Sequence, residues 1–188
     1  MRHHFASTSL LCLLLASLAS RAAETPFITV GTFKQEVRRE FTAADGLPAT
    51  ATTSVAVLDA KTVLAGTANG LARFANGRWT AMKGTTGAPV ETLAASKDKA
   101  FLVLNGRLLS LQGDKLNLIA PLPPGMKVNS ISIGEPIYLA TDQGLFESTS
   151  VALKPVAALN DELGENKSIF QVAVGSRMVV GAAAGLFQ

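Results

Sequence analysis

Cysteine and histidine are nearly absent from this chain of 188 residues. The one cysteine and the two histidines, Cys12, His3 and His4, all lie within the first twelve residues. If these residues are removed as part of a leader, the mature chain has no thiol and no imidazole. This excludes thiol catalysis, disulfides, a Ser-His-Asp triad and ordinary zinc sites. We therefore predict a non-catalytic protein with no metal and no cofactor.

Charged residues are also sparse, at 16% of the chain, and neither sign dominates. Arg2 and Arg21 lie in the first 22 residues, so the rest of the chain has fifteen basic and fourteen acidic residues, a net charge of +1. The basic residues are neither numerous nor clustered, which excludes nucleic acid as a partner.

The N-terminus has the layout of a Sec signal peptide. Arg2 precedes a short apolar run at residues 10–18, and small residues follow at Ser20 and Ala22. The run is too short to span a bilayer, so we predict a signal peptide over residues 1–22 and a periplasmic or secreted mature chain. A signal anchor that remains attached is the alternative. The remaining stretch of about 165 residues is long enough for one domain.

Short apolar segments recur along the mature chain at a nearly constant interval. Val55, Leu93, Ile131 and Val172 are 38, 38 and 41 residues apart, and each is followed two positions later by another apolar or small residue. Alternation with period two predicts a β-strand. A second apolar segment, a glycine turn and a third apolar segment follow in each repeat. These turns are Asn69-Gly70, Asn105-Gly106, Gln143-Gly144 and Ala184-Gly185.

A fourth strand is predicted at residues 78–82 and 116–119, and near Val156–Leu159. Four short antiparallel strands in a repeat of about forty residues are typical of a β-propeller blade. We therefore predict an all-β fold, a partial β-propeller of about four blades, each a four-stranded antiparallel sheet. The predicted blades cover residues 43–84, 85–122, 123–160 and, incomplete, 161–188.

Residues 23–42 precede the first blade and contain two further strand-like segments, at 27–30 and 36–42. We predict that they help to close the ring of blades. An incomplete fourth blade leaves an unpaired sheet edge, which predicts a fragment of a longer gene product. A small protein that pairs its open ends by dimerising is the alternative.

The first full blade carries the residues of a known repeat. It contains the segments Asp45-Gly46-Leu47-Pro48, Val55-Ala56-Val57-Leu58-Asp59, Gly66-Thr67, Gly70-Leu71-Ala72-Arg73-Phe74 and Gly77-Arg78-Trp79. This pattern resembles the two-component regulator propeller repeat. The resemblance implies the extracytoplasmic sensor part of a hybrid signalling protein, followed by a further all-β domain, a membrane span and a histidine kinase or related output domain.

The resemblance favours a ligand-sensing or ligand-binding propeller that contacts the membrane only through missing downstream segments. A secreted scaffold with a protein partner is one alternative, and a propeller enzyme that acts on polysaccharides is another. Propellers host all three functions, so the fold alone does not choose between them.

Four polar residues are the candidate ligand-binding residues, namely Asn69, Asn105, Asp142 and Gln143. They lie in loops between second and third strands, which in a propeller border one mouth of the central channel together with the loops that join the blades. Their amide and carboxylate groups suit a small polar molecule or a glycan. For Asn69 and Asn105, the alternative role is to form tight turns.

Three further features of the sequence have both a structural and a functional interpretation, and we favour the structural one for each. Trp79 and Tyr138 lie at strand positions, so we expect packing between neighbouring sheets rather than ligand stacking. The nearly uncharged segment 169–188 has a membrane helix as its alternative, but Arg177 within it favours a hairpin of the fourth blade. An acidic segment with Asp161, Glu162 and Glu165 is expected to be a solvated turn because its spacing fits no calcium loop.

Overall fold

Short strands build four antiparallel sheets in chain order in the computed structural model, which describes residues 39–149 and 152–188. Blade 1 follows a 3₁₀ helix, η1 (Ala43–Asp45), and comprises β1 (Thr52–Asp59), β2 (Thr62–Thr67), β3 (Gly70–Ala75) and β4 (Arg78–Ala81). Blade 2 comprises β5 (Val90–Ser96), β6 (Lys99–Leu104), β7 (Arg107–Gln112) and β8 (Lys115–Pro121). Blade 3 comprises β9 (Val128–Ser132), β10 (Tyr138–Thr141), β11 (Gly144–Ser148) and β12 (Leu153–Pro155). After the helix α1 (Ala157–Glu162), blade 4 comprises β13 (Ile169–Val174), β14 (Met178–Ala182) and β15 (Gly185–Phe187).

Within each blade the strands pair in the order of the chain, from β1 to β4, from β5 to β8, from β9 to β12 and from β13 to β15. Each pair is an antiparallel hairpin, as expected for short apolar segments separated by glycine turns. The described part of blade 4 has three strands.

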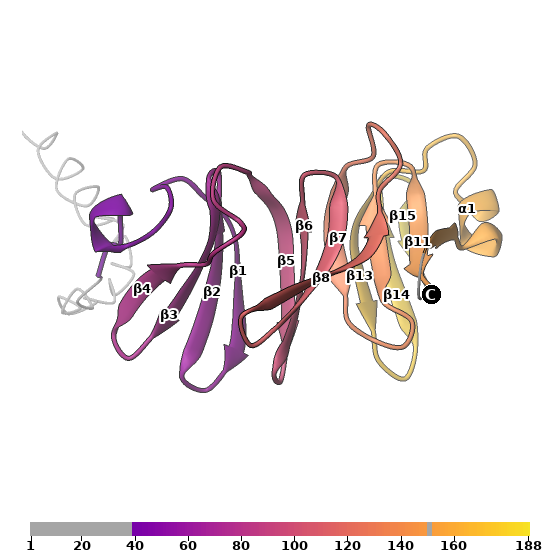
Figure 1. The fold of residues 1–188 in the computed structure, drawn as a ribbon. Helices are drawn as coiled ribbons and strands as arrows, with labels where there is room; N and C mark the ends of the chain where they lie inside the picture. The colour runs from indigo at the N-terminus through magenta and orange to yellow at the C-terminus, as the bar shows by residue number, and fades with distance from the viewer. Residues whose placement is uncertain (1–38, 150–151) are drawn as a thin grey trace, which may run out of the picture. The chain divides into compact units, whose positions relative to one another are not determined.

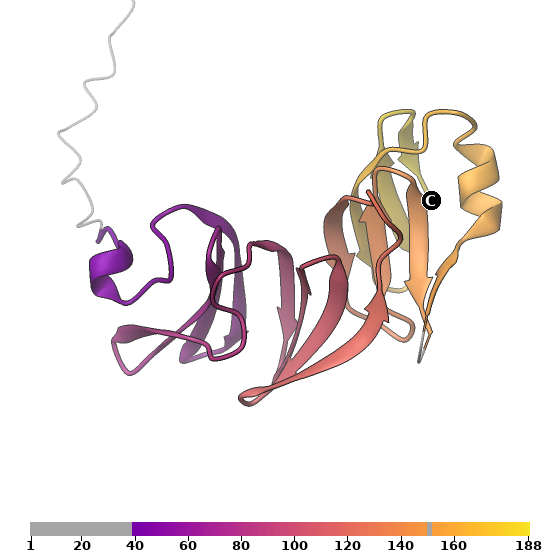
Figure 2. The ribbon, with the colours of Figure 1, turned by 45° about the horizontal axis from the view of Figure 1, so that its top comes forward.

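The blades are stacked face to face in chain order (Figures 1 and 2). The first strands of successive blades contact one another, β1 with β5, β5 with β9 and β9 with β13. We call the side of a blade that faces the following blade its front face and the opposite side its back face. This arrangement confirms the prediction of an all-β, partial β-propeller.

A separate apolar core fills each space between two blades. Between blades 1 and 2 the buried side chains include Leu64, Leu93 and Leu102. The core between blades 2 and 3 includes Val103 and Ile131, and the core between blades 3 and 4 includes Leu145, Ile169 and Val172. Burial of these cores between sheets is the main force that holds neighbouring blades together.

The turn between the second and third strands is closed by a buried threonine in blades 1 and 3. Thr67 Oγ1 donates a 2.7 Å hydrogen bond to the carbonyl oxygen of Gly70, and Thr141 Oγ1 makes the same bond, also 2.7 Å, to Gly144. The backbone N–H two residues after each threonine donates to its Oγ1. The Gly-Thr and Ala-Thr pairs at the ends of these strands are therefore part of the turn.

The segment that leaves each of these blades is tied back to the third strand. The Leu71 N–H donates to Thr85 Oγ1 at 3.0 Å in blade 1, and the Leu145 N–H donates to Asn160 Oδ1 at 2.7 Å in blade 3. Asn160 Nδ2 also donates to the Leu145 carbonyl at 3.0 Å. A polar side chain thus satisfies a buried backbone group that a longer fourth strand would otherwise pair with.

The prediction of a fourth strand near Val156–Leu159 is wrong. The fourth strand of blade 3 is β12, which ends at Pro155, and the predicted segment begins α1. Ala157, Ala158 and Leu159 are good helix formers, and the helix brings Asn160 onto Leu145.

Of the N-terminal segments that the sequence predicts, the structure describes only residues 39–42. The signal peptide, the segment 27–30 and most of the segment 36–42 lie outside the described residues. Residues 39–42 are described and form no strand, because Thr42 instead caps η1 by accepting a hydrogen bond from the Ala44 N–H at Oγ1.

The segment 169–188 forms β13, β14 and β15, so the membrane-helix alternative is wrong and the predicted hairpin is confirmed. Over the part of the chain that the structure describes, no helix has the length and apolar character needed to cross a membrane.

Candidate functional site

The predicted ligand-binding residues lie on one edge of the blades, where loops between second and third strands meet loops that join blades. We call this edge the loop rim. Asn69 connects both kinds of loop in blade 1. Its Nδ2 donates a 3.3 Å hydrogen bond to the Pro48 carbonyl, and its Oδ1 accepts a 3.1 Å hydrogen bond from the Gly87 N–H. Both polar atoms of this side chain are therefore used to fix the rim.

Asp142 has the same role in blade 3. Its Oδ1 accepts a 2.9 Å hydrogen bond from the Lys127 N–H, while its own N–H donates to the Lys127 carbonyl at 3.1 Å. The loop before β9 is thereby held against the turn between β10 and β11. The second carboxylate oxygen of Asp142 makes no hydrogen bond to the residues described, and it remains available to a ligand.

Asn105 and Gln143 are exposed side chains on the rim, and neither makes a side-chain hydrogen bond within the described part of the chain. Asn105 has a φ of 51°, which places it in the left-handed conformation that the tight turn between β6 and β7 requires. Asp142 and Gln143 are thus consecutive residues of one turn. Asn69 holds two loops in place through its side chain, and Asn105 forms a tight turn.

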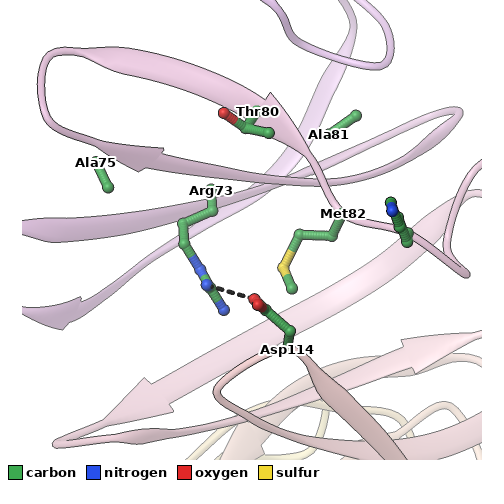
Figure 3. Close-up of a pocket in the computed structure, with 7 residues that line it drawn as sticks. Arg73, Ala75, Thr80, Ala81, Met82 and Asp114 are labelled. Atoms are coloured by element: carbon green, nitrogen blue, oxygen red, sulfur yellow. Dashed lines mark hydrogen bonds and ion pairs between the residues drawn. The ribbon is translucent and has the colours of Figure 1, made fainter.

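A cleft that the sequence did not predict opens beside blades 1 and 2. It has a volume of about 470 Å³ and is lined by Arg73, Ala75, Thr80, Ala81, Met82, Lys83 and Asp114 (Figure 3). Arg73 on β3 reaches the turn between β7 and β8, where its Nη1 lies 2.6 Å from Asp114 Oδ1 and its Nη2 donates to the Gly113 carbonyl.

The Arg73 guanidinium therefore joins blade 1 to blade 2 rather than standing free in the cleft. Its Nε is buried and has no hydrogen-bond partner among the described residues. Asp114 is 84% exposed, so water screens the ion pair and its contribution to stability is small, about 1 kcal/mol or less. A charged residue within the otherwise apolar segment Leu71–Phe74 was the sequence signal for this contact, because a buried charge needs a partner.

Trp79 packs in an aromatic cluster on the back face of blade 1. Its ring centroid lies 5.1 Å from that of Phe74 and 5.9 Å from that of Phe41. Arg39 lies over the Phe41 ring, with Cζ at 4.7 Å from the centroid. Trp79 is thus a packing residue, although its neighbour across the sheet face is the segment before η1 and not a second sheet.

Tyr138 packs at the core between blades 3 and 4, as predicted. The prediction of a turn at the acidic segment is wrong for Asp161 and Glu162, which end α1, and only Glu165 lies in the turn that follows; all three side chains are exposed. Within the described residues, no group of three acidic, cysteine or histidine side chains is placed to hold a metal ion. The turn between β1 and β2 holds Asp59, whose Oδ1 accepts a 2.7 Å hydrogen bond from the Lys61 N–H. That bond lowers the pKa of Asp59, which lies at the edge of blade 1 away from the loop rim.

No family model matches the chain, and no curated protein matches it either. Solved structures do match it. Two structures of the extracellular domain of BT4673 from B. thetaiotaomicron, described once as a hybrid two-component system and once as a one-component system, are similar with a TM-score of 0.61 and 17% sequence identity. The match covers 78% of this chain and 22% of that chain.

A weaker likeness is to PorZ, a bacterial surface component of the type-IX secretion system of Porphyromonas gingivalis. The match to PorZ has a TM-score of 0.50 and 14% sequence identity, and it covers 72% of this chain and 19% of the PorZ chain. The chain thus spans about a fifth of the length of these neighbours. At these identities the likeness shows the fold alone, and it confirms the propeller that the resemblance to the two-component regulator propeller repeat predicted.

Proposed function

We propose that this chain is a non-catalytic, extracytoplasmic propeller segment that binds a small polar molecule or a glycan at the loop rim for a signalling protein of the two-component type. The predicted leader and the repeat resemblance support an extracytoplasmic sensor. The BT4673 structures are of an extracellular domain of a signalling system, which supports the same role.

The observation that carries the proposal is the construction of the loop rim. Asn69 and Asp142 each fix an inter-blade loop by hydrogen bonds, so the loops are ordered before any ligand arrives. Beside these fixed loops, the side chain of Gln143 and one oxygen of Asp142 retain free hydrogen-bonding capacity. Prearranged polar groups bind with less loss of conformational entropy than mobile ones do.

The proposal predicts that Gln143→Ala weakens ligand binding without changing stability. The purified full chain is titrated calorimetrically with a panel of neutral and acidic oligosaccharides and of free amino acids. We expect at least one compound to bind, and the substitution to raise its dissociation constant about tenfold, the effect of losing one good hydrogen bond.

Gln112→Ala is the matched control, because Gln112 is an exposed glutamine at the far end of β7, away from the loop rim. It should leave both binding and thermal unfolding unchanged. The proposed function fails if no compound in the panel binds, or if the two substitutions weaken binding equally.

A further inference from the structure

The cleft beside blades 1 and 2 lies between two blades whose four strands are all described. One wall is the front face of blade 1, where Arg73 on β3 pairs with Thr80 on β4. The facing wall is the turn between β7 and β8 of blade 2, which carries Asp114. The volume of the cleft, about 470 Å³, lies within the range of about 300–1,000 Å³ that is usual for small-molecule sites.

The lining of the cleft combines polar and apolar side chains. Arg73, Met82 and Asp114 point into the same space (Figure 3). Met82 is 7% exposed, and its flexible thioether can adapt to the shape of a bound apolar group. Ala75 contributes only a methyl group to the wall of blade 1, which leaves room beside Arg73.

The fold of a blade does not require an arginine at the position of Arg73. The same position, two residues after the buried leucine near the start of the third strand, holds Ser110 in blade 2 and Glu147 in blade 3. Blades therefore form with a cation, a neutral group or an anion at this position. The positively charged cleft is a feature of blades 1 and 2 and not of the repeat.

The charges that line the cleft leave one positive charge unmatched. Arg73 and Asp114 form an ion pair, with 2.6 Å between Nη1 and Oδ1. Lys83 also lines the cleft, and it forms no ion pair within the described residues. Two cations and one carboxylate give a net charge of +1. A ligand with a single negative charge is therefore complementary to the cleft.

Two side chains of the cleft are free to donate hydrogen bonds to such a ligand. They are the Lys83 ammonium and the Thr80 hydroxyl, which is exposed and has no hydrogen-bond partner in the part of the chain that the structure describes. Arg73 is already held by Asp114 and by the Gly113 carbonyl, so its guanidinium is a fixed positive charge beside these donors. A carboxylate accepts several hydrogen bonds and donates none, which suits this set of groups.

We propose that this cleft binds a small carboxylate with an apolar body. The carboxylate accepts hydrogen bonds from Lys83 and Thr80, and the apolar body packs against Met82 and Ala75. None of the four candidate residues of the loop rim lines the cleft. The site is therefore separate from the proposed function and does not rest on it.

The methyl groups of the methionines test the site directly, because three of the four methionines lie in three different described places. Met82 lines the cleft, Met126 lies in the core between blades 2 and 3, and Met178 packs at the core between blades 3 and 4. The purified full chain, isotopically labelled at these methyl groups, is titrated with phenylacetate and with hexanoate in NMR experiments. The concentration is raised to about 20 mM, well above the dissociation constant of about 1 mM expected for ligands of this size.

The signal of the Met82 methyl group should shift in a saturable way with at least one carboxylate, while the signals of Met126 and Met178 stay in place. The spectrum of Met82→Leu assigns the signal. Phenylacetamide and hexanamide have nearly the same size and no charge, so each should bind at least about fivefold more weakly than its carboxylate.

Lys83→Gln removes the unmatched charge and should raise the dissociation constant of the carboxylates about fivefold, a modest effect because water screens an exposed ammonium. Lys154→Gln is the matched control, because Lys154 is an exposed lysine on β12 of blade 3 and does not line the cleft. Gln143→Ala on the loop rim should also leave the Met82 shift unchanged, so a failure of the loop rim and a failure of the cleft are distinguishable.

Four outcomes would overturn the proposal. Neither carboxylate shifts the Met82 signal, or the three methionine signals shift alike. The amides bind as tightly as the carboxylates, or Lys83→Gln and Lys154→Gln have the same effect on the dissociation constant.

Discussion

Replacing Leu145 by alanine should lower the free energy of unfolding by about 2–5 kcal/mol, the range found for leucine-to-alanine changes in well-packed cores. Leu145 is fully buried in the core between blades 3 and 4, together with Ile169, Val172 and Val180. The substitution removes apolar contacts and leaves a cavity between two sheets that cannot collapse without shifting a blade. Urea unfolding followed by circular dichroism measures the change.

Leu186→Ala is the matched control, since Leu186 has the same place in the repeat as Leu145 and is 78% exposed. Its effect on the stability of a single copy should be within about 0.5 kcal/mol, as for other exposed positions. Equal losses at the two positions would contradict the exposed position of Leu186 on β15.

Gly144→Ala is expected to destabilise the chain by about 2–4 kcal/mol, through backbone strain together with a lost buried hydrogen bond. Gly144 has a φ of 122°, a conformation that side chains other than glycine rarely adopt. An added Cβ would lie 2.5 Å from Asn160 Oδ1 and 2.8 Å from its Cγ. Asn160 cannot withdraw without breaking its two hydrogen bonds to Leu145.

The comparison for this substitution is Gly106→Ala in the equivalent turn of blade 2. Gly106 also has a positive φ, at 63°, but nothing lies within 4 Å of its added Cβ. It should cost only about 1–2 kcal/mol, the expense of a left-handed backbone alone. Thermal unfolding of both variants separates the two contributions, and a smaller loss for Gly144→Ala than for Gly106→Ala would contradict the proposed contact with Asn160.

The sequence was sufficient to predict the blades because the information is local and repeated. Alternating apolar residues such as Val55 and Val57, followed by turns such as Asn69-Gly70, specify hairpins without reference to distant parts of the chain. The interval between Val55, Leu93 and Ile131 then indicates one blade for each repeat.

Contacts between blades were harder to predict, because they depend on which residues face each other after stacking. The ion pair of Arg73 with Asp114 joins residues 41 positions apart. The third strand of blade 1 donates a hydrogen bond to Thr85, and the third strand of blade 3 donates the equivalent bond to Asn160. The two acceptors differ in residue type, and Thr85 lies in a loop whereas Asn160 lies in a helix. Such substitutions preserve a hydrogen bond but not a sequence pattern.

The candidate site could be located only to an edge of the fold. Turn positions of the repeat placed Asn69, Asn105, Asp142 and Gln143 on that edge, but sequence could not show which of their polar atoms hold loops together. The structure shows that both polar atoms of the Asn69 side chain, Nδ2 and Oδ1, hold loops in place. The equivalent turn of blade 3 retains free polar groups, and Gln143 is for that reason the residue to substitute.

Hydrogen exchange of the backbone amides, followed by mass spectrometry on the full chain, tests the stacked-blade account most directly. Slow exchange should recur at the inner strands, because each of them is paired on both sides, and faster exchange should occur at the loops that join the blades; the inner strands are β2, β3, β6, β7, β10, β11 and β14. The peptide that covers β15 should exchange about tenfold faster than the one that covers β11, which has strands on both sides. Outer strands protected better than β6 and β10, or one uninterrupted protected stretch across an inter-blade loop, would contradict the account.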